Sequence, residues 1–215
     1  MNIIFDFDGV VINSHKVKTQ AFYEVFKHYG KNIAYKAKKF HEKNIGKSRY
    51  FKFKHVLKKI LNKEITKNEL SKLDKNFENF VKKKIKKLIP SNFLLKFLRD
   101  HKKFYNLYVS TGTPKNKIIL TLKEKKLFSY FNKVYGSPRS KFSHIQEIKK
   151  NKKNILFIGD RLEDYKIARK TKINFILKLN SENIKLRKKI NVKKINSFKF
   201  LEKHISNLGL KNLKN

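Results

Sequence analysis

The stretch that decides the fold is residues 2–11, NIIFDFDGVV. Its first part, 2–7, is short, apolar and β-branched, and so predicts a buried strand. Two carboxylates, Asp6 and Asp8, stand one residue apart where this strand ends, although the chain has only 16 Asp+Glu against 55 Lys+Arg. Because side chains alternate along a strand, both carboxylates are expected to point the same way. Such a pair next to apolar residues indicates a site rather than a surface turn.

Length and composition allow a core of ordinary size. The chain has 215 residues, of which 40% are hydrophobic, enough for one domain or for a domain with a smaller insertion. The absence of cysteine excludes disulfides and cysteine-based zinc sites. With no stretch of 18 consecutive apolar residues and no recognisable signal segment, we expect a soluble cytoplasmic protein without membrane contacts.

The formal net charge of +39 first suggests a nucleic-acid or anionic membrane partner. The lysines are, however, spread along the whole chain, and only six of the 55 basic residues are arginine, the residue that usually reads bases. This distribution favours a solvated lysine surface over nucleic-acid binding. A surface that binds or steers anions remains the alternative.

A helical block follows the first strand. Apolar residues recur at three- and four-residue steps over 17–29, 48–62 and 66–89, the pattern of amphipathic helices with lysines on the opposite face. Pro90 ends the last of them. No convincing strand is predicted between 14 and 89, so this segment is interpreted as an insertion.

Beyond Pro90 strands alternate with helices. The predicted strands are 106–111, 133–136, 154–160 and 174–179, and the predicted helices are 91–102, one beginning at Pro114, one near 140–150, 162–171 and one near 197–206. This alternation is typical of a parallel sheet. The sequence therefore predicts an α/β protein whose Rossmann-like core, residues 1–13 and 90–215, is interrupted by the helical segment 14–89.

Polar residues follow each predicted strand, at the edge where open α/β sheets bind ligands. They are Asp6 and Asp8 after the first strand, Ser110, Thr111 and Gly112 at the end of the second, Lys141 after the third, and Asp160 and Asp164 at the end of the fourth. Clustered carboxylates without a counter-charge are costly. Bound Mg²⁺, which prefers oxygen ligands, removes that cost.

These residue types in this arrangement indicate phosphoryl transfer. A metal held by the carboxylates also offsets charge on a substrate phosphate. Lys141 neutralises the remainder, and the hydroxyl and backbone N–H groups near Thr111 and Gly112 hold phosphate oxygens. One carboxylate can then attack phosphorus while the other moves the proton.

Four motifs occur in order: DFDGVV, STGTP, GSPRSK and GDRLED. In this order and spacing the chain, over residues 1 to about 180, resembles the haloacid dehalogenase-like (HAD) hydrolase superfamily, in its phosphoglycolate phosphatase and β-phosphoglucomutase-like branch. The resemblance implies that 14–89 is a helical cap over an α/β catalytic core. DxDG alone is weak evidence, whereas the ordered set of four is specific.

The resemblance also implies a role for each motif residue. Asp6 corresponds to the nucleophile and Asp8 to the general acid/base. Both bind Mg²⁺ together with Asp160, Asp8 through its backbone carbonyl. The phosphate-binding positions are Thr111 (with Ser110 as a close rival), Gly112 and Lys141, and Asp164 corresponds to a carboxylate that supports the metal ligands.

Two features depart from the family pattern or lie outside its motifs. Arg161 occupies a place where a small residue is common; it either reaches the substrate or is solvated, and we favour solvated. In the predicted cap, Arg49 and Lys52 of the segment 44–55 are the candidate substrate contacts, because Arg suits a bidentate anion contact. Gly46 of that segment is expected to allow a turn.

The sequence thus predicts a Mg²⁺-dependent phosphatase of a small phosphorylated metabolite, such as a sugar phosphate or a phosphoglycolate-like acid, with an aspartyl-phosphate intermediate. A phosphomutase of the β-phosphoglucomutase type shares all the core residues and remains an alternative. A nucleic-acid-binding protein on an inactive scaffold of this kind is the alternative from another class. The sequence gives no prediction of the oligomeric state.

Overall fold

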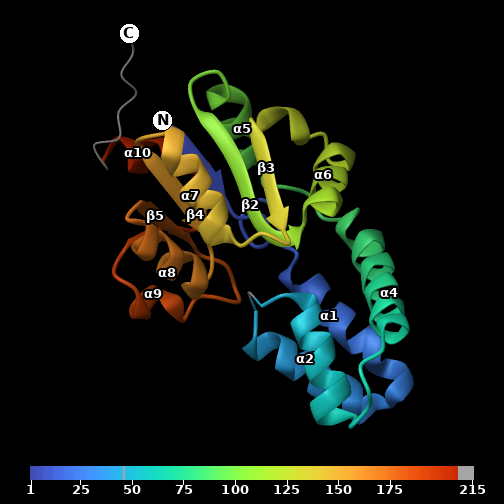
Figure 1. Cartoon of the computed structure of the whole chain (residues 1–215). Helices are drawn as coiled ribbons and strands as arrows, with labels where there is room; N and C mark the ends of the chain where they lie inside the picture. Colours follow the sequence, from blue (N-terminus) through green and yellow to red (C-terminus); the bar gives the residue numbers. More distant parts are fainter. Residues whose placement is uncertain (46, 208–215) are drawn as a thin grey trace. The chain divides into compact units, whose positions relative to one another are not determined.

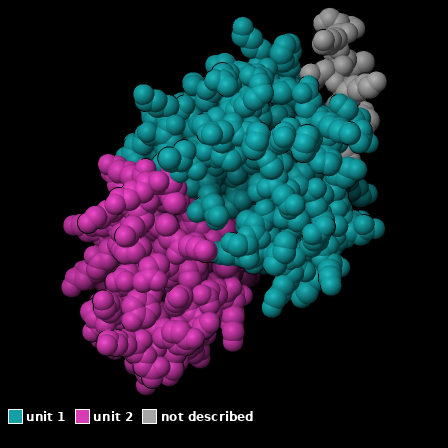
Figure 2. Space-filling model, turned by 180° about the vertical axis from the view of Figure 1, so that it is seen from behind, with its two compact units in different colours: residues 1–13, 89–215 teal, residues 14–88 magenta. Residues whose placement is uncertain are grey.

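A computed structural model describes residues 1–45 and 47–207. The chain divides into two compact units: unit 1 is Met1–Asn13 with Ile89–Asn215, and unit 2 is Ser14–Leu88. Figure 2 shows the two units in different colours. Ile89, expected within the helical segment, belongs to unit 1, and the turn expected at Gly46 lies outside the described residues.

Unit 1 is built on a six-stranded sheet in the order β3-β2-β1-β4-β5-β6, in which all neighbouring strands run parallel. The strands are β1 (Asn2–Phe5), β2 (Asn106–Pro114), β3 (Lys133–Ser137), β4 (Ile155–Gly159), β5 (Asn174–Lys178) and β6 (Lys193–Ile195). Strand β1 lies between β2 and β4, so both neighbours of the first strand come from much later in the chain. The predicted α/β class with a parallel sheet is confirmed.

Helices cover both faces of this sheet (Figure 1). They are α5 (Asn92–His101), α6 (Lys115–Glu124), α7 (Lys141–Asn151), α8 (Leu162–Thr171), α9 (Leu186–Lys189) and α10 (Leu201–Ser206), with short 3₁₀ turns at Phe128–Tyr130 and Phe198–Phe200. On one face Ile4 packs with buried residues of α7 and α8. On the other, the ring of Phe5 contacts Phe97 of α5 and Phe198. Successive side chains of β1 therefore point to opposite faces of the sheet and contribute to the core on each face.

Two differences from the predicted elements of unit 1 concern the sheet and its connections. Strand β2 continues to Pro114, which pairs with Ser137 of β3, so the following helix begins one residue later than expected. The sequence pattern also predicts neither helix α9 nor strand β6. Within β6 only Ile195 is buried, so this edge strand carries almost no apolar pattern.

Over its described residues, 14–45 and 47–88, the regular elements of unit 2 are all helical. Its elements are α1 (His15–Phe26), a 3₁₀ turn (Lys27–Tyr29), α2 (Lys31–Lys43), α3 (Arg49–His55), a π-helical turn (Val56–Ile60) and α4 (Lys67–Ile85). Its own core contains Phe22, Phe26, Phe53 and Phe77. Among the described residues of the whole chain, no helix combines the length and apolar content needed to cross a membrane.

Candidate active site

The loop after β1 fixes the first carboxylate at the sheet edge. Asp6 follows β1 directly and is 4% exposed. Its backbone N–H donates to the carbonyl of Ile158 in β4 (2.9 Å), and its Oδ1 accepts from the N–H of Phe7 (2.7 Å). Gly9, at a positive φ of 84° that favours glycine, lets the chain turn so that its N–H reaches the carbonyl of Ile12 at 2.7 Å. Asp6 is therefore fixed through its backbone and through its carboxylate.

Lys141 is the first residue of α7, where Ser140 caps the helix by accepting from the N–H of Ser143. This start brings the Lys141 ammonium to two carboxylates. Its Nζ lies 2.9 Å from Oδ1 of Asp6 and 2.7 Å from Oδ1 of Asp164. The structure thus places the predicted lysine beside the predicted nucleophile.

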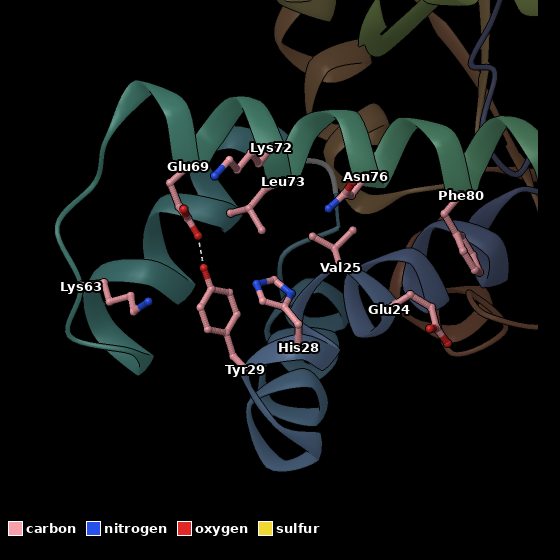
Figure 3. Close-up of a pocket in the computed structure, with 10 residues that line it drawn as sticks. All are labelled: Glu24, Val25, His28, Tyr29, Lys63, Glu69, Lys72, Leu73, Asn76 and Phe80. Carbon is pink, nitrogen blue, oxygen red and sulfur yellow. Dashed lines mark hydrogen bonds between the residues drawn. The ribbon is translucent and has the colours of Figure 1, made fainter.

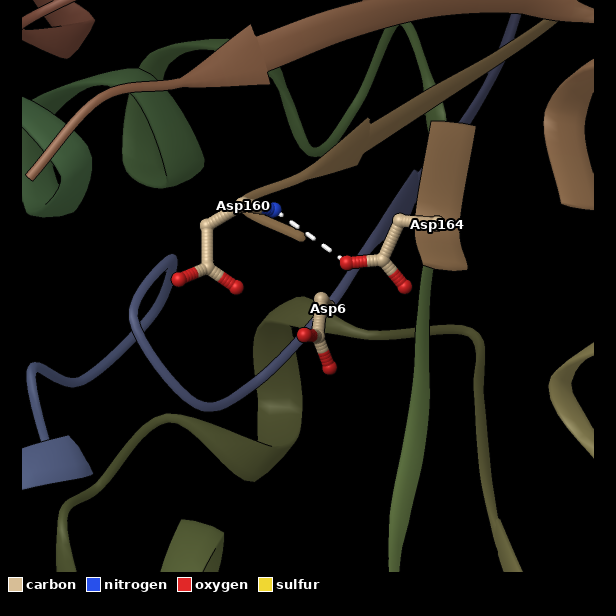
Figure 4. Close-up of side chains that lie close together, drawn as sticks. All are labelled: Asp6, Asp160 and Asp164. Carbon is tan, nitrogen blue, oxygen red and sulfur yellow. Dashed lines mark hydrogen bonds between the residues drawn. The ribbon is translucent and has the colours of Figure 1, made fainter. Parts of the chain in front are cut away.

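Asp160 and Asp164 come from the end of β4 and the first turn of α8. Oδ2 of Asp164 accepts from the backbone N–H groups of Asp160 (3.2 Å) and Arg161 (3.1 Å), and the first of these bonds is drawn in Figure 4. Gly159 makes this approach possible, because a Cβ at that position would lie 2.5 Å from Cβ of Asp164. Since Asp164 also binds Lys141, both its oxygens serve to position neighbours.

Three carboxylates converge at this edge (Figure 4). Asp6, Asp160 and Asp164 are all buried, and one oxygen from each lies within 4.8 Å of the others. Buried, oxygen-only donors at this spacing fit a small hard divalent cation such as Mg²⁺. The carboxylate of Asp8 is not in this group but accepts from Oγ1 of Thr113 at 3.4 Å. Its expected metal contact through the backbone carbonyl remains a prediction.

Electrostatics favour a cation here. Burial raises the pKa of Asp6 well above its usual range; Lys141 opposes this rise, while the carboxylates of Asp164, Asp160 and Asp8 add to it. For Lys141 burial alone lowers the pKa, but the carboxylates of Asp164 and Asp6 outweigh it and the net shift is upward. The site therefore holds more negative charge than its lysine neutralises.

The two hydroxyls at the end of β2 differ in their surroundings. Oγ of Ser110 lies 3.0 Å from Nδ1 of His144 in α7, and both residues are buried. Oγ1 of Thr111 accepts from the N–H of Thr113 at 3.2 Å, which leaves its own proton for another acceptor. The neighbouring Gly112 is exposed, and a Cβ at its position would meet nothing within 4 Å. Thr111 is thus the better candidate for a phosphate contact than Ser110.

His144 is a buried residue to which the sequence pattern assigns no role. Burial, reinforced by the nearby Arg139, lowers its pKa to about 4. The imidazole is therefore neutral at ordinary pH, and it anchors α7, the helix that carries Lys141, to β2 through Ser110.

The loop after β5 supplies two further residues that the sequence does not predict. Nδ2 of Asn180 donates to Oδ2 of Asp160 (2.9 Å), and Nδ2 of Asn183 donates to the backbone carbonyl of Asp160 (2.7 Å). Both amides hold Asp160 in place. The available signal is their position: they follow the predicted strand 174–179 at the same edge of the sheet.

The interpretation of Arg161 as a solvated residue is wrong. Its side chain is only 13% exposed, with Nε 3.3 Å from Oδ2 of Asp160 and Nη2 3.3 Å from Oε2 of Glu182. The two acids, one from each neighbouring strand end, draw the guanidinium against the sheet edge instead of leaving it in water.

Within unit 2, the two predicted substrate contacts have partners in the same unit. Nε of Arg49 lies 2.6 Å from Oδ1 of Asp74. Lys52 is 4% exposed, and its Nζ lies 3.2 Å from Nδ1 of His41. Their roles toward a substrate stay predictions.

Unit 2 also contains a cavity of about 660 Å³, shown in Figure 3. Across it the hydroxyl of Tyr29 in the 3₁₀ turn hydrogen-bonds the carboxylate of Glu69 in α4. Its lining residues are Glu24, Val25, His28, Tyr29, Lys63, Glu69, Lys72, Leu73, Asn76 and Phe80. None of the predicted site residues is among them, so the carboxylate cluster remains the candidate active site.

Comparisons with known proteins identify the family and the fold of the chain. The family model described as haloacid dehalogenase-like hydrolase matches residues 3–178. No curated protein matches the chain significantly. Among similar solved structures, a predicted phosphoglycolate phosphatase from Haemophilus somnus 129pt has 19% identity and a TM-score of 0.75, covering 94% of this chain and 96% of its own. A β-phosphoglucomutase from Clostridium difficile has 18% identity and a TM-score of 0.74, with coverage of 98% and 99%. At these identities the structural likeness concerns the fold.

Proposed function

The chain belongs to the haloacid dehalogenase-like hydrolase family, and from this premise we propose that it is a Mg²⁺-dependent phosphatase of a small phosphorylated metabolite. The observation that carries the proposal is the buried group of Asp6, Asp160 and Asp164 with Lys141 bound to two of them. A cluster of this charge and burial suits a divalent cation and a phosphate better than it suits a purely structural role.

In the proposed reaction Asp6 is the nucleophile. Its carboxylate attacks the phosphorus of the monoester, the bond to the leaving oxygen breaks, and an aspartyl-phosphate forms. Asp8 donates a proton to the leaving oxygen, then removes one from the water that attacks the aspartyl-phosphate. Inorganic phosphate leaves and Asp6 is regenerated.

The remaining residues bind and orient the reactants. Asp6 and Asp160, with the backbone carbonyl of Asp8, would hold Mg²⁺, which when bound supplies positive charge that keeps the buried nucleophile ionised and offsets charge on the phosphate. Lys141 faces the same phosphate, and the Thr111 hydroxyl with the Gly112 N–H would bind its oxygens. Asp164 fixes the direction of the lysine.

Substrate choice is assigned to unit 2, acting as a cap. Arg49 and Lys52 are the proposed contacts, and their positive charge suits a phosphorylated, acidic or polyhydroxylated metabolite. The names of similar solved structures, phosphoglycolate phosphatase and β-phosphoglucomutase, support a sugar phosphate or a phosphoglycolate-like acid as the class. The proposal thus gives the chemistry to the core residues and substrate selection to those of unit 2.

The test is release of inorganic phosphate from a panel of phosphorylated metabolites and a generic aryl phosphate, with Mg²⁺ or with EDTA. Asp6→Asn is the blank, because it removes the nucleophile at constant size, and Asp100→Asn, an exposed acid on α5, is the matched control. We expect Mg²⁺-dependent turnover for wild type and D100N and none above background for D6N. Turnover that survives D6N would contradict the mechanism. No turnover together with steeply salt-dependent DNA binding would favour the nucleic-acid alternative.

A phosphomutase is the second candidate, because similarity to the Clostridium difficile β-phosphoglucomutase extends over 98% of this chain. The two activities share the attack by Asp6 and differ in whether water or a second substrate hydroxyl receives the phosphoryl group. Product analysis separates them: a phosphatase releases one phosphate per substrate consumed, whereas a mutase yields an isomeric phosphate without net release.

A further inference from the structure

Arg161 stands beside a proposed metal ligand and takes no part in the proposed reaction. We propose that its guanidinium is a built-in cation that competes electrostatically with the divalent metal at Asp160, and that Glu182 moderates this competition. Arg161 would thereby set the metal affinity of the site. The inference rests on the proposed function, because it assumes that Asp160 binds the metal.

Arg161 and Asp160 interact through their charges, without a directional hydrogen bond from Nε. Nε lies 3.3 Å from Oδ2 of Asp160, yet this Nε makes no hydrogen bond within the described part of the chain. The Arg161 side chain is 13% exposed, so water screens its charge little. A positive charge held this close to a carboxylate weakens the attraction of that carboxylate for a second cation.

The orientation of Asp160 does not depend on Arg161. Asn180 already donates to Oδ2 at 2.9 Å, and Asn183 donates to the backbone carbonyl at 2.7 Å. Both amides are neutral, so they fix the geometry of the ligand without opposing a metal. Removing the arginine charge should therefore leave the carboxylate in place and make it more available to a cation.

Glu182 acts on the opposite side of the guanidinium. Its Oε2 lies 3.3 Å from Nη2 of Arg161, and its side chain is 23% exposed. By neutralising part of the guanidinium charge it lessens the repulsion of a metal at Asp160. Arg161 and Glu182 are thus expected to change metal affinity in opposite directions, and Glu182 to act mainly through Arg161.

The experiment is a titration of the intact protein with Mn²⁺, without substrate, in which free Mn²⁺ is measured by electron paramagnetic resonance. The variants are Arg161→Gln, Arg161→Lys, Glu182→Gln and the double variant of Arg161→Gln with Glu182→Gln. We expect the Mn²⁺ dissociation constant to fall roughly ten-fold in R161Q, as Coulomb interaction across a few ångströms at a protein surface implies. R161K, which keeps the charge, should stay within about two-fold of wild type, and E182Q should raise the constant roughly three-fold.

The double variant decides how Glu182 acts. If Glu182 works through the guanidinium, the effect of E182Q shrinks once the arginine charge is gone, which is a non-zero coupling in the double-mutant cycle. Equal effects of E182Q in both backgrounds would overturn the moderating role. Arg161→Met is the second charge-free variant, used if circular dichroism shows that R161Q does not fold.

The outcomes separate this inference from the proposed function. Unchanged or weaker Mn²⁺ binding in R161Q, alongside loss of binding in Asp160→Asn, would overturn the inference and leave the proposed metal site intact. No Mn²⁺ binding by wild type would overturn both. Tighter binding in R161Q but not in R161K supports the inference, even if the substrate panel has yielded no activity.

Discussion

Nζ of Lys141 lies 2.7 Å from Oδ1 of Asp164, although 23 residues separate the two along the chain. The same ammonium lies 2.9 Å from Oδ1 of Asp6. One ammonium therefore joins the end of β1 to the first turns of α7 and α8. The ion pairs of Lys141 with Asp6 and Asp164 are therefore expected to stabilise the fold and to position the residues of the proposed site.

The first prediction concerns this lysine. Lys141→Met leaves two buried carboxylates without their cation, and breaking a buried pair in this way costs about 3 to 5 kcal/mol. We expect the free energy of unfolding in urea, measured with EDTA present, to fall by about 3 kcal/mol. Lys141→Arg keeps the charge, so its free energy of unfolding should fall by less than half of the decrease expected for Lys141→Met. Equal stability of K141M and wild type would show that the ion pairs contribute nothing.

The second prediction separates the two hydroxyls of β2. Thr111→Ala removes the proposed phosphate donor, and we expect kcat/KM on the best substrate of the panel to fall roughly 100-fold. Ser110→Ala instead removes the hydroxyl that lies 3.0 Å from the buried Nδ1 of His144, so it should lower the free energy of unfolding by about 1 kcal/mol. The reverse pattern, with S110A inactive and T111A active, would assign the phosphate contact to Ser110.

The third prediction is a pH dependence of stability. The folded-state pKa of His144 is lowered to about 4 by burial and by Arg139, whereas in the unfolded chain it is about 6.5. Between these values the unfolded state binds the extra proton, so stability is present above about pH 6.5 and is lost as pH falls toward about 4. The loss is on the order of 3 kcal/mol. The measurement is urea unfolding at neutral pH and at a pH just above the folded-state pKa of His144. Between these two conditions the free energy of unfolding should fall less for His144→Gln than for wild type.

The fourth prediction tests the close approach of Gly159 and Asp164. In Gly159→Ala the new methyl group would stand 2.5 Å from Cβ of Asp164, and overpacking of this kind costs about 1 to 3 kcal/mol. We expect a lower unfolding midpoint and weaker Mn²⁺ binding, since Asp164 positions Lys141 and the backbone at Asp160. Gly112→Ala is the matched control, because its methyl group meets nothing within 4 Å; a similar destabilisation there would indicate that the effect is not steric.

The order of the first five strands along the chain can be predicted, because each of them is a short apolar run followed by polar residues at one edge. Helix α2 cannot be predicted from the sequence pattern. Its buried residues are Ala34, Ala37 and His41, which are too small or too polar to give an apolar stripe. Strand β6 escapes prediction for a similar reason, since lysines occupy two of its three positions.

Within the site, the residues brought together by strand order are predictable, and those placed by side-chain packing are not. Asp6, Asp160 and Asp164 follow from the rule that parallel strands end at one edge. Of the two ion pairs of Arg161, the one with Glu182 joins residues 21 positions apart, and Glu182 lies in a loop of no regular pattern. No local feature of the sequence predicts this contact, and so the sequence pattern alone indicates a solvated arginine.

The position of β1 between β2 and β4 has a consequence for how the protein is made. Asp6 is synthesised long before its partner strand β4, which begins at Ile155. Asp6 therefore meets β4 only after all of unit 2 and most of the sheet have been synthesised, and its contacts with β4 are of the non-local kind that slow folding. A nascent chain that ends before Ile155 contains DFDG but lacks β4 and Asp160, so the carboxylate cluster of Asp6, Asp160 and Asp164 forms only late in translation.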